Sequence, residues 1–102
     1  MQQIKLVKNK DKLIFKLFGE IDSANSEDFL AEVEAAYKND KKDIEFDCAE
    51  LTFIDSTMLG TFVKILKALK ADGHNMCLYN VQPRIIKLFE ICALDTIMEI
   101  RR

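Results

Sequence analysis

Apolar and polar residues alternate at the beginning of the chain. Ile4 and Leu6 start a period of two, and after the polar residues 9–12 the same period resumes over 13–17, ahead of Gly19. Such alternation is typical of strands that bury one face, and a polar segment between two alternating runs favours a hairpin. The pattern therefore predicts two antiparallel strands.

Three later stretches have the period of an amphipathic helix, with apolar residues about every three to four positions. The first follows residues 22–28, which are rich in helix-capping side chains, and ends near Asn39. The second follows Asp55 and stops at Gly73, and the third opens with Pro83, a residue suited to the first helical position. The residues expected to face the core are Phe29, Leu30, Val33 and Tyr37 in the first helix, Leu59, Phe62, Val63, Leu66 and Leu69 in the second, and Ile85, Ile86, Phe89 and Cys92 in the third.

Strands separate these helices. Residues 43–48 alternate and predict a strand, with a short apolar segment at 49–54, and residues 75–79 and 96–100 predict two more strands. Strands that alternate with helices build parallel units, whereas the opening hairpin is antiparallel. We therefore expect residues 1–102 to form a single α/β domain of order β-β-α-β-α-β-α-β, with a mixed sheet covered by helices.

The composition is that of an ordinary globular domain. Of the 102 residues 49% are hydrophobic and 31% charged, and 15 basic residues face 17 acidic ones. This near balance gives no general attraction to nucleic acid or anionic lipid, so neither is an expected partner. No stretch approaches the roughly 20 apolar residues of a bilayer span, and the first residues lack the apolar run of a signal peptide. We expect no membrane insertion and a cytoplasmic location.

The residue types that support most catalysis are scarce. Cys48, Cys77 and Cys92 are widely spaced among apolar neighbours, which predicts buried, reduced thiols. The only histidine, His74, follows Gly73 in a predicted turn, so neither a metal cluster nor a Ser-His-Asp relay is expected. The few glycines are too far apart for a phosphate-binding loop. We therefore predict no catalytic residue, no metal and no cofactor.

Segment 52–60, Thr-Phe-Ile-Asp-Ser-Thr-Met-Leu-Gly, is the most informative part of the chain. It delivers Asp55, Ser56 and Thr57 to the start of a strongly amphipathic helix. Either Asp55 or Ser56 can cap that helix by accepting hydrogen bonds from free backbone N–H groups. A hydroxyl at a helix start also lies at the surface of a rigid scaffold, so a structural and a functional role are compatible.

Segment 52–60 resembles the signature of the STAS domain of bacterial anti-sigma factor antagonists, in which an Asp-Ser-Ser/Thr-Gly-Leu-Gly segment carries a phosphorylated serine. Residues 19–22, Gly-Glu-Ile-Asp, resemble the segment that ends the second strand in that family. Residues 80–85, Asn-Val-Gln-Pro-Arg-Ile, resemble the opening of its last helix. The resemblance covers almost the whole chain in the same order.

This resemblance implies a partner-switching regulator rather than an enzyme. In such a cycle the unphosphorylated antagonist binds an anti-sigma factor that is also a serine kinase, phosphorylation breaks the complex, and a metal-dependent serine phosphatase restores it. Ser56 matches the phosphoacceptor, and the neighbouring Thr57 is a second candidate hydroxyl. The residues expected at the partner surface are Glu20, Asp22, Asp55, Thr57, Met58 and Gly60.

Met58 departs from the family pattern, which most often has glycine there. Its flexible apolar side chain either packs into a pocket of a partner or turns inward as a core residue. This departure keeps open a second hypothesis, a STAS scaffold or soluble subunit of a membrane-associated complex that has no phosphoswitch. A third hypothesis is a small-ligand or nucleotide-binding domain or an enzyme, but the sequence contains no phosphate-binding loop that would support it.

Overall fold

The computed structural model describes the backbone of all 102 residues and every side chain except that of Lys8. Its elements are β1 (Ile4–Lys8), β2 (Lys12–Ile21), α1 (Ser26–Asn39), β3 (Asp43–Ile54), α2 (Ser56–Ala71), β4 (Met76–Tyr79), α3 (Pro83–Ile91), the 3₁₀ helix η1 (Leu94–Thr96) and β5 (Glu99–Ile100). The predicted α/β fold and the predicted order of strands and helices are confirmed.

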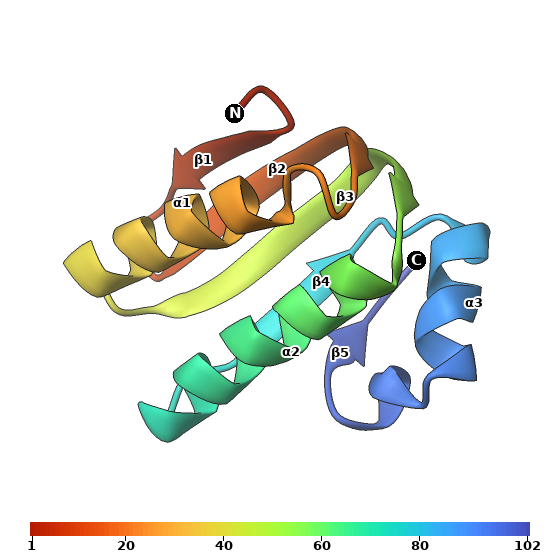
Figure 1. Ribbon diagram of the computed structural model, residues 1–102. Coiled ribbons are helices and arrows are strands. Elements are labelled where there is room, and N and C mark those ends of the chain that lie inside the picture. The colour runs from red at the N-terminus through yellow and green to blue at the C-terminus, as the bar shows by residue number, and fades with distance from the viewer.

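The five strands form one mixed sheet in the order β1-β2-β3-β4-β5. β1 is antiparallel to β2, and the other neighbours are parallel. Because connections between neighbouring parallel strands are right-handed, a strand order that follows the sequence places the connecting helices on one face of the sheet. Figure 1 shows α1 and α2 side by side over that face.

The core lies between this face and the helices, and aromatic rings fill its centre. Phe62 of α2 contacts Phe29 of α1 edge to face at 5.6 Å between ring centroids, and Phe46 of β3 at 5.3 Å. Phe89 of α3 lies 6.0 Å from the same ring. One side chain of the second helix thus joins the other two helices to the sheet, so the position of α2 is set by the core.

The opposite face of the sheet carries polar side chains. Lys12 and Lys16 of β2 lie beside Asp43 and Asp47 of β3, and the Lys12 ammonium is 2.8 Å from a carboxylate oxygen of Glu45. None of these side chains is buried. The alternation of β2 and β3 therefore reflects a sheet with one face in the core and one in water.

Two strands run further than the alternation predicts. β2 continues beyond Gly19 to Ile21, and β3 is one strand to Ile54 rather than a strand at 43–48 followed by a separate segment. The register between these strands shifts twice along β2, between Lys16 and Phe18 and again after Gly19. Such irregularities break the period of two, and Gly19 adopts the left-handed conformation at φ 64. The alternation of apolar and polar residues is lost in this part of β2 and β3, although the two strands remain paired.

The C-terminal end also differs from the prediction. The strand expected at 96–100 is limited to Glu99–Ile100, because Leu94–Thr96 form η1 after Ala93 turns the chain at φ 58. Cys92, predicted to be buried, is exposed. It follows the last residue of α3, so the helical period no longer sets the direction of its side chain.

Candidate functional site

The site is built where β2 and β3 end. Ile21 and Ile54 are partners in the parallel register, so the residues that follow them, Asp22 and Asp55, leave the sheet next to each other. α1 begins four residues after Asp22, and α2 begins directly after Asp55. The carboxyl edge of a parallel sheet is the usual place for functional groups in open α/β folds. The pairing of two strands therefore unites two acidic segments that lie 33 positions apart.

Asp55 has two structural roles. One oxygen of its carboxylate accepts a hydrogen bond from the Met58 backbone N–H at 3.1 Å, which caps α2. The other oxygen accepts the Ser23 backbone N–H at 2.9 Å, which ties the loop between β2 and α1 to the start of α2. Of the two capping candidates, Asp55 is therefore the one that caps the helix.

The loop between β2 and α1 is held by its own side chains. The Asp22 backbone N–H donates to the side-chain oxygen of Asn25 at 2.9 Å, and the Asp22 carboxylate accepts the Ala24 backbone N–H at 2.9 Å. The Asn25 backbone N–H closes the turn on the Asp22 carbonyl at 3.1 Å. Together with the bond from Ser23 to Asp55, these contacts join the loop and the first turn of α2 into one hydrogen-bonded surface.

Ser56 is the first residue of α2, and its side chain is exposed. Thr57 and Gly60 are also exposed on the same helix. Because Asp55 supplies the cap, the Ser56 hydroxyl is not needed to begin the helix. It is presented to solvent next to a carboxylate, and backbone N–H groups at the helix start favour a negative charge there.

Met58 does not belong to this surface. Its side chain is fully buried and is part of the hydrophobic core. The expectation that Met58 contacts a partner is wrong for this structure, because the helical turn directs the third residue of α2 toward the sheet. The second reading of this residue, an inward core position, is the one observed.

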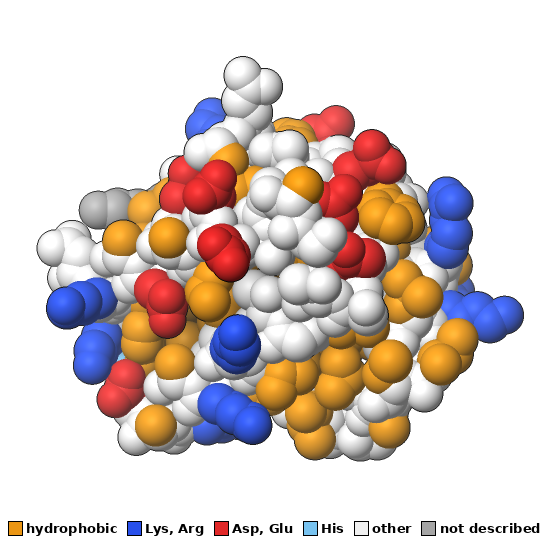
Figure 2. All heavy atoms as spheres, in the orientation of Figure 1, with side chains coloured by type: hydrophobic (Ala, Val, Ile, Leu, Met, Phe, Trp, Pro, Cys, Tyr) orange, Lys and Arg blue, Asp and Glu red, His pale blue; other side chains and the backbone are white. Residues whose placement is uncertain are grey.

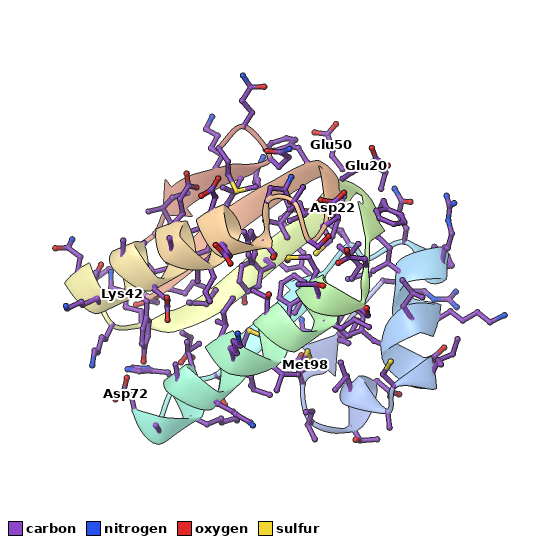
Figure 3. The ribbon with its side chains drawn as sticks, in the orientation of Figure 1. Glu20, Asp22, Lys42, Glu50, Asp72 and Met98 are labelled. Carbon is purple, nitrogen blue, oxygen red and sulfur yellow. The ribbon has the colours of Figure 1, made fainter. Side chains whose placement is uncertain are left out.

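Four acidic side chains surround the site: Glu20, Asp22, Glu50 and Asp55. Figure 3 shows Glu20, Asp22 and Glu50 close together at the same end of the molecule, and Figure 2 shows acidic side chains gathered on that part of the surface. Among them lies Phe53, the register partner of Glu20, with 45% of its surface exposed. The site thus combines one exposed aromatic ring with an acidic border.

The sequence interpretation missed four contributors, which are Ser23, Asn25, Glu50 and Phe53. Ser23 contributes a backbone N–H, a group that no sequence pattern marks. Asn25 had a detectable signal, since asparagine in a polar loop commonly bonds to nearby backbone groups. Glu50 follows the first register shift and Phe53 follows the second, so the period of two does not show which face these side chains occupy.

Away from the site, the pKa values of Tyr37, Cys48 and Cys77 are raised. The Tyr37 hydroxyl donates to the Asp72 carboxylate at 2.8 Å, and burial together with this bond raises the pKa of Tyr37 to about 12. Asp72 follows the C-terminal end of α2, far from Asp22 in Figure 3. Burial also raises the pKa of the Cys48 and Cys77 thiols. These thiols stay protonated at neutral pH and are poor nucleophiles.

Among the side chains that the structure describes, no group of three or more His, Cys, Asp or Glu residues is arranged to hold a metal ion. His74 is 3.3 Å from Asp43, away from Ser56. Across the same described part of the chain, every helix is too short or too polar to cross a bilayer.

Replacing Asp55 by alanine is expected to lower the free energy of unfolding by about 1–3 kcal/mol. The substitution removes a helix cap, which contributes about 0.5–2 kcal/mol, and a second hydrogen bond to the Ser23 N–H. Asp55→Asn keeps one oxygen for the cap but places an amide N–H₂ against the Ser23 N–H. Its free energy of unfolding should therefore lie between those of the parent and Asp55→Ala. Urea unfolding of the three proteins measures this order. Equal midpoints would show that the carboxylate does not hold the two segments together.

The comparisons with known proteins agree with this architecture. Residues 3–102 match the family described as STAS domain. A Bacillus subtilis protein named anti-sigma-B factor antagonist is 32% identical over 92 residues, which cover 90% of this chain and 84% of that protein.

Two solved structures are similar in fold. A Thermotoga maritima protein assigned to the anti-sigma factor antagonists covers 99% of this chain and 87% of its own, with a TM-score of 0.89 at 23% identity. The Bacillus cell fate determinant SpoIIAA in its phosphorylated form covers 95% and 89%, with a TM-score of 0.74 at 24% identity. Since the family match spans all but the first two residues, the chain belongs to the STAS domain family.

Proposed function

We propose that this chain is an anti-sigma factor antagonist that works by partner switching. Unmodified, it binds an anti-sigma factor that is also a serine kinase. Transfer of the γ-phosphoryl group of ATP to the Ser56 oxygen, with loss of the hydroxyl proton, ends the complex. Hydrolysis of the phosphoserine by a serine phosphatase restores the hydroxyl and the binding form. The chain itself performs no catalysis in this cycle.

The observation that carries the proposal is the exposed Ser56 hydroxyl at the start of a helix whose cap is supplied by Asp55. A phosphate on Ser56 would add about 1.5–2 negative charges close to the backbone N–H groups of the first turn of α2, which favour an anion. The fold therefore tolerates the modification. The partner, in contrast, meets a larger negative charge on a surface that already contains Asp22 and Asp55.

Two further observations support the proposal. The Met58 side chain is in the core, so it does not obstruct the approach of a kinase to Ser56. The curated relative at 32% identity is named as an anti-sigma-B factor antagonist, and the similarity covers most of both chains. The acidic residues Glu20, Asp22 and Asp55, with Thr57 and Gly60 on α2, form the proposed contact surface for the kinase.

The test is a phosphorylation assay with the purified anti-sigma factor kinase of the source organism and ATP. Mass spectrometry of peptides should find one phosphate on Ser56 in the parent chain and in Thr57→Ala, and none in Ser56→Ala. The purified serine phosphatase of that organism should remove it. A phosphate on Thr57 would assign the switch to the other hydroxyl, and no phosphate at all would favour a STAS scaffold without a phosphoswitch.

A further inference from the structure

A groove of about 190 Å³ separates α1 from α2 on the exposed side of the two helices. Ser26 and Leu30 of α1 form one wall, and Thr57 and Gly60 of α2 form the other. Thr57 directly follows Ser56, so the groove starts one residue from the proposed switch and continues along the helices. It therefore lies beside the surface that a partner bound at Ser56 would cover.

Gly60 has no structural reason to be glycine. It lies inside α2 with ordinary helical geometry, and a Cβ atom built on it has no atom within 4 Å beyond the neighbouring residues and the backbone of its own helix. Glycine inside a helix is less stable than alanine. Gly19 and Gly73 differ, because their φ angles of +64° and +78° lie in the left-handed region that favours glycine. What glycine provides at position 60 is an uncovered stretch of helix backbone facing the groove.

Ser26 provides a second observation. The residue is only 4% exposed and lines the groove. Within the described part of the chain, the Ser26 hydroxyl forms no hydrogen bond. It is also not fully buried, because every fully buried side-chain N or O atom among the described residues has a hydrogen-bond partner. The hydroxyl therefore keeps a small solvent access, on a residue that lines the groove. This hydroxyl is therefore free to hydrogen-bond to a group from outside the chain.

We propose that the groove receives a short segment of the kinase that binds at Ser56. The main chain of this segment passes over Gly60, where a Cβ atom would hold it away, and hydrogen-bonds to the Ser26 hydroxyl. An apolar side chain of the segment rests on Leu30. Glu27 and Lys64, which lie at the groove with opposite charges, select a segment with the complementary charges in the same register. The proposal rests on the proposed function, because the occupant is the same partner.

Gly60→Ala tests the proposal by separating stability from binding. We expect the melting temperature to rise by about 4–8 °C, because alanine is the better helix former and the site has space for its methyl group. We expect the affinity for the purified kinase, measured by titration calorimetry without ATP, to fall at least about tenfold. Ser26→Ala should weaken binding severalfold with little change in melting temperature.

Gly73→Ala is the matched control, since it makes the same chemical change at the end of α2 away from Ser56. It should lower the melting temperature because of its positive φ, and leave the affinity unchanged while the protein is folded.

The outcomes separate the two proposals. If Ser56→Asp weakens kinase binding while Gly60→Ala binds like the parent, the groove is not part of the interface and the proposed function stands. A lower melting temperature for Gly60→Ala would show that the fold itself requires the glycine, and would overturn the groove proposal. If the parent chain does not bind the kinase, both proposals fall.

Discussion

Ser56→Asp is expected to weaken binding of the anti-sigma factor kinase by about 3- to 100-fold. The interface fits a neutral hydroxyl, so the aspartate charge is left without a counter-charge when the kinase binds. One charge roughly 6 Å from a like charge across the interface costs about 0.7–3 kcal/mol, for an effective dielectric constant between 80 and 20. A phosphoserine adds up to twice that charge and should weaken binding more. The melting temperature should stay within a few degrees of the parent, since the start of α2 favours an anion.

Two variants complete this experiment. Ser56→Ala should bind the kinase as the parent does and should remain bound when ATP is added. Asn39→Asp adds the same single charge at the far end of α1 and should leave the affinity unchanged, which shows that position and not net charge matters. Titration calorimetry gives all of these affinities. Wild-type affinity for Ser56→Asp, together with release of Ser56→Ala by ATP, would contradict the switch assigned to Ser56.

Met58→Ala is expected to lower the free energy of unfolding by about 2–5 kcal/mol, the usual cost of truncating a fully buried methionine. The side chain fills space in the core beneath the first turn of α2, so its loss leaves a cavity close to the switch. Guanidinium unfolding followed by circular dichroism measures the change. Met58→Leu, which nearly conserves volume, should cost less than about 1.5 kcal/mol.

The affinity of Met58→Ala for the kinase distinguishes a core role of Met58 from direct contact with the partner. Folded Met58→Ala should retain the affinity of the parent to within a few-fold, because the side chain does not reach the surface. An affinity loss of tenfold or more with unchanged stability would show that Met58 leaves the core when the kinase binds.

The sequence predicted the order of strands and helices because the longer elements carry a periodic pattern of their own. The hairpin, the three helices and the position of Ser56 at a helix start all follow from local patterns. Lengths were predicted less well where pairing depends on a distant strand. β2 and β3 continue past two register shifts because they pair with each other, and no local pattern records that pairing.

For the candidate site, the sequence indicated which acidic residues meet but not the contacts that they make, and their role in binding a partner stays a prediction. Glu20, Asp22 and Asp55 were expected near one another from the resemblance, and the register of Ile21 with Ile54 explains their proximity. Whether Asp55 or Ser56 caps α2 depends on side-chain rotamers, which sequence does not specify. Likewise, the inward direction of Met58 depends on where the helix begins relative to the sheet, since Thr57, one position earlier, is exposed.

In the proposed cycle, the two hydrogen bonds that Asp55 accepts also affect how quickly a partner can bind. The carboxylate fixes the loop after β2 and the first turn of α2 before any partner arrives, so neither has to lose conformational entropy during association. A preorganised surface of this kind can be engaged at the rate of collision and orientation, without a slow ordering step. The rate of the proposed regulatory response would then be set by the kinase that adds the phosphate and the phosphatase that removes it.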